Sequence, residues 1–131
     1  MKGFSLIEVV VVMVLIALTL TLAGPRIGAG LGRLELERSA QTIRSVIKLG
    51  RVQASREDRE YYVKIDRKGD SIALLDPDMK IVRQEKLSSS IEILLESGTD
   101  VAGLTISPFG IVRGNAVRLR GRAGELSVNF Q

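Results

Sequence analysis

Phe4-Ser5-Leu6-Ile7-Glu8 opens a stretch, residues 4–23, that is apolar except at Ser5, Glu8 and two threonines. At about 1.5 Å per residue, a helix of this length spans a hydrocarbon core of about 30 Å. Lipid offers the backbone no hydrogen-bond partner, and so the valine run 9–12 is expected to be helical despite its poor helix propensity in water. The sequence therefore predicts a membrane-spanning helix near its N-terminus.

Glu8 separates three interpretations of this segment. A secretory signal peptide would be cut near Ala23, whereas a plain single-span anchor would stay uncut. Neither needs a carboxylate, which costs about 2.5–3.5 kcal/mol at the centre of a spanning helix. In the third interpretation a short leader is cut after Gly3 and the apolar helix remains on the mature chain. An ionisable residue inside such a segment is by default a functional candidate, and so Glu8 favours the third interpretation.

The charged residues are concentrated beyond this segment. Of 19 Lys and Arg and 15 Asp and Glu, only Lys2 and Glu8 precede Arg26, which leaves residues 26–131 mildly basic. Cysteine, histidine and tryptophan are absent. Their absence excludes disulfides, the usual zinc and haem ligands, and Ser-His or Cys-His nucleophile pairs. We expect no catalytic residue, no metal site and no cofactor, and therefore no enzyme.

A second helical pattern follows the apolar segment. Its apolar stripe consists of Leu36, Ala40, Ile43, Ile47, Gly50 and Ala54. Steps of three and four residues place this stripe on one face of an amphipathic helix. Gly24-Pro25 lies between the two patterns and is interpreted as a kink rather than a helix end. One helix is thus expected from about Phe4 to about Arg56.

After Asp58 the pattern changes to short β-type segments. The predicted strands are Tyr61–Asp66, Ser71–Leu75, Lys80–Glu85, Ile91–Leu95, Leu104–Ser107, Ala116–Arg120 and Glu125–Phe130. Residues 68–70 and 76–78 are turn signals, and Asp76 and Asp78 are interpreted as turn residues rather than calcium ligands. The predicted fold class is α+β, with a long N-terminal helix packed on a C-terminal antiparallel β-sheet domain.

Gly3-Phe4-Ser5-Leu6-Ile7-Glu8, followed by the long apolar stretch, resembles the class III signal of type IV pilins and type II secretion pseudopilins. The resemblance implies that a prepilin peptidase cuts between Gly3 and Phe4, that Phe4 becomes N-methylated, and that Glu8 takes part in assembly. The chain would then divide into a prepilin leader (1–3), a transmembrane or filament-core helix (4–25), its amphipathic continuation (26–57) and a periplasmic β domain (58–131).

Two outer stretches are similar to the GspH/FimT group, which contains H-type minor pseudopilins and FimT-type minor pilins. They are residues 51–55 running into 61–66, and residues 104–110 followed by 115–119. The resemblance implies a single-pass protein of the bacterial inner membrane that acts near the tip of a periplasmic type II secretion pseudopilus. Its partners would be other pilin-like subunits, the prepilin peptidase and the inner-membrane assembly platform. The alternative is a FimT-like minor pilin that binds DNA during uptake.

Four arginines are candidates for nucleic-acid contact: Arg113, Arg118, Arg120 and Arg122. Arg118 and Arg120 alternate with apolar residues and should share one face of a strand. That face is either a patch that contacts phosphates or a solvated strand surface. The second interpretation is favoured because no aromatic residues for base stacking lie nearby. DNA-binding FimT-type pilins use arginines in a tail beyond the last strand, whereas this sequence stops at Gln131, and so their activity is not carried over directly.

Overall fold

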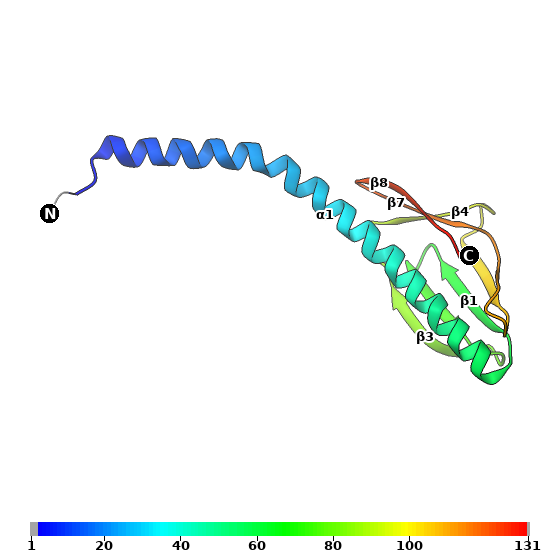
Figure 1. The fold of residues 1–131 in the computed structure, drawn as a ribbon. Coiled ribbons are helices and arrows are strands. Elements are labelled where there is room, and N and C mark those ends of the chain that lie inside the picture. Colours follow the sequence, from blue (N-terminus) through cyan, green and yellow to red (C-terminus); the bar gives the residue numbers. More distant parts are fainter. Residues whose placement is uncertain (1–2, 131) are drawn as a thin grey trace.

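A long helix joined to a unit of antiparallel strands makes up the protein (Figure 1). The computed structural model describes residues 3–130, with side chains described except at positions 23–27 and 29. The helix is α1 (Leu6–Glu57). The strands in this range are β1 (Tyr61–Asp66), β2 (Ser71–Leu75), β3 (Ile81–Lys86), β4 (Glu92–Leu95), β5 (Val101–Ile106), β6 (Val112–Arg113), β7 (Val117–Gly121) and β8 (Gly124–Val128). The predicted α+β class is confirmed.

Polar groups at both ends define the limits of α1. Ser5 is the N-cap, and its side chain accepts a hydrogen bond from the Glu8 amide at 3.3 Å, which satisfies one of the free donors of the first turn. Asp58 ends the helix in a left-handed conformation with φ 53°, and its amide donates to Ala54 O. The helix is continuous from Leu6 to Glu57, within two residues of the predicted limits. The kink predicted at Gly24-Pro25 lies outside the residues whose side chains are described.

The strands form two sheets. The five-stranded sheet has the order β3-β2-β1-β5-β6, and the three-stranded sheet has the order β4-β7-β8. Each pairing is antiparallel, as predicted. The predicted strand at Leu104 begins three residues earlier, at Val101, because Gly103 lies inside it and glycine counts against a strand in a sequence pattern. β6 was not predicted, because its two residues are too few to show an alternating pattern.

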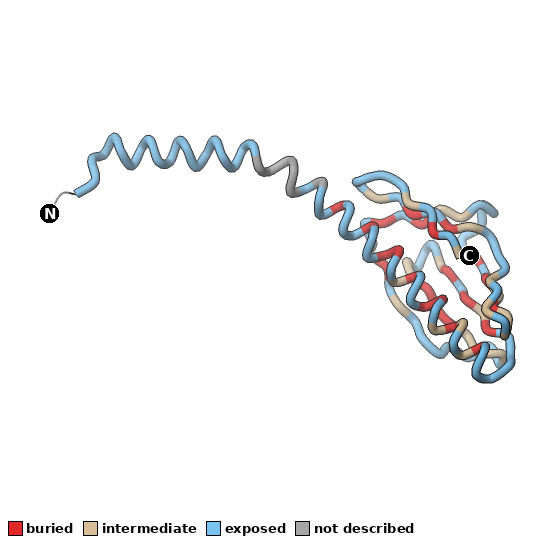
Figure 2. Tube along the Cα trace, in the orientation of Figure 1, coloured by how far each residue is buried: buried red, intermediate tan, exposed pale blue. Residues whose placement is uncertain are grey.

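The core lies between the C-terminal half of α1 and the two sheets (Figure 2). The predicted stripe of α1 is buried at all six positions. It packs against β1, β2, β5, β7 and β8. In β1 the residues Tyr61, Val63 and Ile65 face this core and are at most 3% exposed. The Tyr61 hydroxyl donates to Glu57 Oε2 at 2.7 Å, and this hydrogen bond, reinforced by burial, raises the pKa of Tyr61 to about 12.

At Gly50, α1 lies directly against side chains of the five-stranded sheet. A Cβ atom at this position would lie 2.5 Å from Ile106 Cδ1 and 2.9 Å from Leu74 Cδ1. Real Cβ atoms do not approach other carbons this closely, and so any larger residue must displace the tips of both side chains. The absence of a side chain at Gly50 therefore sets the distance between helix and sheet.

This contact gives a testable prediction. Gly50→Ala should overpack the core, at a cost of about 1–3 kcal/mol in the free energy of unfolding. Gly30→Ala is the matched control, because nothing lies within 4 Å of a Cβ atom there and both substitutions gain the same helix propensity. Denaturation of the full chain in mild detergent, followed by circular dichroism, measures the difference. Equal stability of the two variants would contradict the predicted close contact.

Candidate functional site at the N-terminus and the arginine strand

The Gly3–Phe4 peptide bond lies in the short segment that precedes α1. Residues 3–5 have no regular secondary structure, and the Phe4 side chain is 82% exposed. Since the Ser5 cap fixes the start of the helix, the bond before Phe4 stays outside the helical hydrogen-bond ladder. This arrangement leaves the predicted cleavage point accessible to a peptidase. Met1 and Lys2 of the predicted leader lie outside the described residues.

Glu8 is a single carboxylate on an apolar surface. It lies in the first turn of α1, where the helix dipole favours a negative charge. Phe4, Val9 and Val12 line a shallow groove with it, together with two residues of the next turns, Met13 and Ile16. Among residues 3–22, all of which are described, no basic side chain lines this groove, and so a positive partner of Glu8 has to come from outside this stretch.

The apolar half of the helix projects away from the strands (Figure 1). Residues 3–22 are exposed throughout (Figure 2). Within the described residues, no helix meets the combined length and hydropathy expected of a membrane span. The membrane-spanning role of residues 4–25 stays a prediction.

The four candidate arginines do not form one patch. Arg118 and Arg120 share the exposed face of β7, as the alternation predicted. Arg113 belongs to β6 and therefore to the other sheet. Arg122 lies in the turn between β7 and β8 beside α1, where a Cβ atom added at Gly32 would meet Arg122 Cβ at 3.5 Å. Their contact with nucleic acid stays a prediction.

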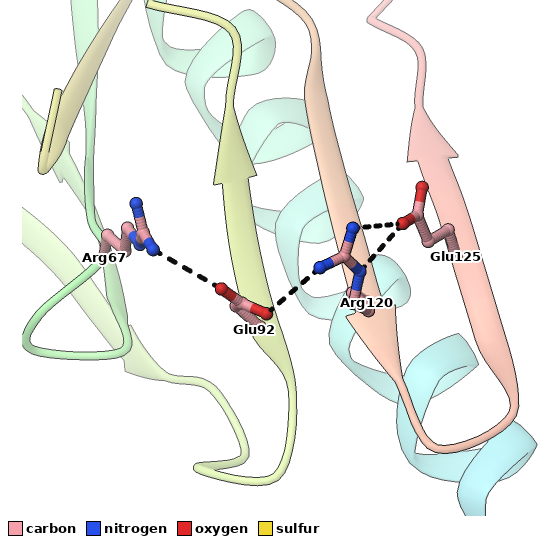
Figure 3. A network of polar contacts seen from close by, with 4 residues as sticks. All are labelled: Arg67, Glu92, Arg120 and Glu125. Atoms are coloured by element: carbon pink, nitrogen blue, oxygen red, sulfur yellow. Dashed lines mark hydrogen bonds and ion pairs between the residues drawn. The ribbon is translucent and has the colours of Figure 1, made fainter. Parts of the chain in front are cut away.

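Arg120 is held by two carboxylates (Figure 3). Its Nε and Nη2 lie 2.8 and 2.7 Å from Glu125 Oε1, and its Nη1 lies 3.7 Å from Glu92 Oε2. Glu92 in turn contacts Arg67 Nη2 at 3.4 Å. The hydrogen bond and charge of Glu125 raise the pKa of Arg120. The four side chains balance in charge, and so this part of the strand face offers little free positive charge to a phosphate.

The sheet register brings this network together. Glu92, Arg120 and Glu125 are direct cross-strand partners on β4, β7 and β8. Opposite charges at such positions each contribute roughly 0.2–1 kcal/mol. The pairing of Glu92 with Arg120 was not predicted from the sequence, because β4 and β7 are segments far apart in the chain. The network aligns strands and has no free acid or base arranged for catalysis.

Asp76 and Asp78, interpreted above as turn residues, lie in the turn between β2 and β3. Asp76 Oδ1 accepts hydrogen bonds from the amides of Asp78 and Lys80 at 3.0 and 2.8 Å, which closes the turn between β2 and β3. The turn interpretation is confirmed. Across the described residues, no group of three or more Asp or Glu side chains is arranged to hold a metal ion.

Comparison with known proteins bears on the N-terminal segment. Residues 1–24 match the prokaryotic N-terminal methylation motif. The predicted class III signal, which is typical of type IV pilin-like proteins, is thus supported over these residues. The match includes Gly3, Phe4 and Glu8 and ends where the apolar stretch ends. No curated protein matches the sequence.

Two kinds of solved structure are similar in shape. One is the type IV minor pilin FimU of Pseudomonas aeruginosa, at 14% identity and a TM-score of 0.49, covering 75% of this chain and 91% of that one. The other is the minor pseudopilin EpsH of the Vibrio cholerae type 2 secretion system, at 14% identity and a TM-score of 0.41, covering 71% and 95%. Similarities at this level decide nothing about the role of this chain.

The contacts of the four arginines predict how strongly the chain binds DNA and which arginines contribute. Any binding should be weak, with a dissociation constant in or above the non-specific range of about 10⁻⁴–10⁻⁶ M. The affinity should fall steeply as the salt concentration is raised. Because Arg120 is occupied by carboxylates, Arg120→Ala should change binding less than the double variant Arg118→Ala/Arg122→Ala. Anisotropy of a labelled duplex, titrated with full chain at two salt concentrations, measures both effects. Tight binding that is lost with Arg120→Ala alone would contradict the network and favour the DNA-uptake alternative.

Proposed function

We propose that this protein is a minor pseudopilin: a structural subunit near the tip of a type II secretion pseudopilus that aids protein export across the outer membrane. One observation carries the proposal. A class III signal is followed directly by a helix whose apolar surface is exposed, and this helix continues into the core of a folded β unit. Such a protein has an attachment segment and a displayed domain, and its role is structural rather than catalytic.

The exposed surface of residues 4–22 explains why such a subunit needs partners. Large apolar side chains along this segment are 47–87% exposed in the single chain. Continuous apolar surface of this extent marks a contact with lipid or with other chains. We infer that lipid of the inner membrane covers it first and that helices of neighbouring pilin-like subunits cover it after assembly. The same apolar face suits both surroundings, so that moving from one to the other has a small net cost.

Glu8 then helps to set the register between neighbouring subunits of the filament. Cleavage between Gly3 and Phe4 by a prepilin peptidase leaves a positively charged N-terminus on Phe4, which stays charged after methylation. In the filament the ammonium group of one subunit would pair with Glu8 of its neighbour. Either charge alone is unfavourable in a dry bundle, and so subunits that align the pair are favoured over those that do not.

A FimT-like minor pilin that binds DNA is the alternative. Arg118 and Arg122 support it, because both are exposed and neither has an ion-pair partner within 4 Å among the described residues. The network around Arg120 argues against a continuous phosphate track. Purification from membranes distinguishes the two candidates, since the pilin-like subunits and assembly-platform proteins that accompany the chain would come from a secretion system or from a pilus.

Replacing Glu8 tests the proposed role directly. Glu8→Leu should leave folding and cleavage intact, since Glu8 lies at the far end of α1 from the core. It should reduce assembly, because leaving one partner of a buried pair uncompensated costs about 3–5 kcal/mol. The measurement is crosslinking to co-purified pilin-like subunits in membranes, with protein level as the reference.

Glu37→Leu is the matched control. Glu37 is also an exposed carboxylate of α1, but it pairs with Arg33 of the same chain at 3.1 Å. We expect crosslinking with Glu37→Leu to stay near the wild-type level. If Glu8→Leu crosslinked as well as the control, the carboxylate would have no part in assembly.

A further inference from the structure

Arg44, Lys48 and Arg51 form a basic stripe on α1. Their spacing of four and three residues places them on one face of the helix. Together with Ile47, Asn129 and Phe130 they line a groove between α1 and the residues that follow β8. Within residues 3–130, no acidic side chain lines this groove.

Several cationic side chains of the unit pair with carboxylates, but among the described residues those of the basic stripe do not. Arg33 pairs with Glu37, Arg83 with Glu85, and Arg120 with Glu125, each within 3.1 Å. Among the described residues, no carboxylate lies within 4 Å of the three residues of the stripe. Three uncompensated charges beside one another repel, and this repulsion is relieved when an anion binds.

The guanidinium group of Arg51 has a hydrogen-bond partner at Nη2 but none at Nε among the described residues. Its Nη2 donates to the carbonyl oxygen of Phe130, which orients the guanidinium group at the edge of the groove. Its Nε is buried and has no hydrogen-bond partner among the described residues. A buried donor without an acceptor is unfavourable, and so a shift of the guanidinium group toward an acceptor in the groove would be favoured. A carboxylate is the acceptor that a guanidinium group binds most readily in proteins.

The apolar floor of the groove favours an acidic protein segment over nucleic acid as the anion that binds there. Ile47 is 4% exposed and Phe130 is half-buried, so apolar surface lies between the cationic side chains. Proteins that bind single-stranded nucleic acid combine a basic track with aromatic side chains free to stack on bases, whereas Phe130 packs against the core. A protein segment with acidic and small apolar side chains matches both the charge and the floor.

We propose that this groove binds an acidic segment of a neighbouring protein subunit, with Arg44, Lys48 and Arg51 contacting its carboxylates. The identity of the occupant as a subunit of the same filament rests on the proposed function. The groove lies in the folded unit, far along α1 from Phe4 and Glu8. Binding in the groove is therefore separable from processing and from burial of the N-terminal helix.

The test uses the full chain in neutral detergent and a short labelled peptide in which glutamate alternates with alanine. Fluorescence anisotropy should show binding that weakens as salt is raised. The triple variant Arg44→Gln/Lys48→Gln/Arg51→Gln should bind the peptide about tenfold or more weakly, because it lacks all three charge contacts. A peptide with glutamine in place of glutamate should not bind.

The matched control is Arg33→Gln/Arg38→Gln/Arg56→Gln, which removes the same charge from exposed positions of the same helix. It should keep wild-type affinity for the peptide. Equal losses in both triple variants would show that net charge, not the groove, attracts the peptide. No binding at low salt, or stronger binding of a single-stranded DNA of similar length through the same residues, would also overturn the proposal. Each of these results leaves cleavage at Gly3 and assembly through Glu8 to be judged separately.

Discussion

The apolar surface of residues 4–22 has no partner within the described chain. The need to cover this surface is the constraint on which the account of the helix and of its charged residues depends. The same helix that leaves this surface exposed buries its other half against two sheets, so the exposed apolar segment and the β unit share one continuous helix. The two parts are therefore joined by helix rather than by an irregular linker. A subunit built this way carries its outer surface into a fixed position once its helix is packed among others.

Two kinds of charge contact follow from this arrangement. Glu8 sits among apolar side chains, where an uncompensated charge becomes costly as soon as neighbours exclude water. The pairs on the β unit are half-exposed and individually weak, since exposed ion pairs contribute about 0–1 kcal/mol. Assembly is thus expected to depend strongly on one carboxylate in the helix, whereas the Arg67–Glu92–Arg120–Glu125 network mainly keeps strands in register.

Local patterns in the sequence were enough to predict α1, its buried stripe and most strands, because helix and strand periodicity are set by neighbouring residues. β1 and β2 were predicted with their observed limits. Features that depend on pairing between distant segments were not predicted. The division into two sheets, the approach of Gly50 to Ile106, and the contact of Arg51 with Phe130 all join residues that the sequence separates widely. Arg118 and Arg120 were placed correctly on one strand face, but Glu92, which contacts Arg120, comes from another strand.

The central claim is that a short leader is removed and the whole apolar helix is kept. Intact-mass and N-terminal peptide mass spectrometry of the protein purified from membranes tests it most directly. The mature chain should begin at Phe4, carry one added methyl group on its N-terminal amine, and retain residues 4–23. A mature N-terminus near Gly24 would contradict the claim, because it would make the apolar segment a discarded secretory signal and leave Glu8 without a role in assembly.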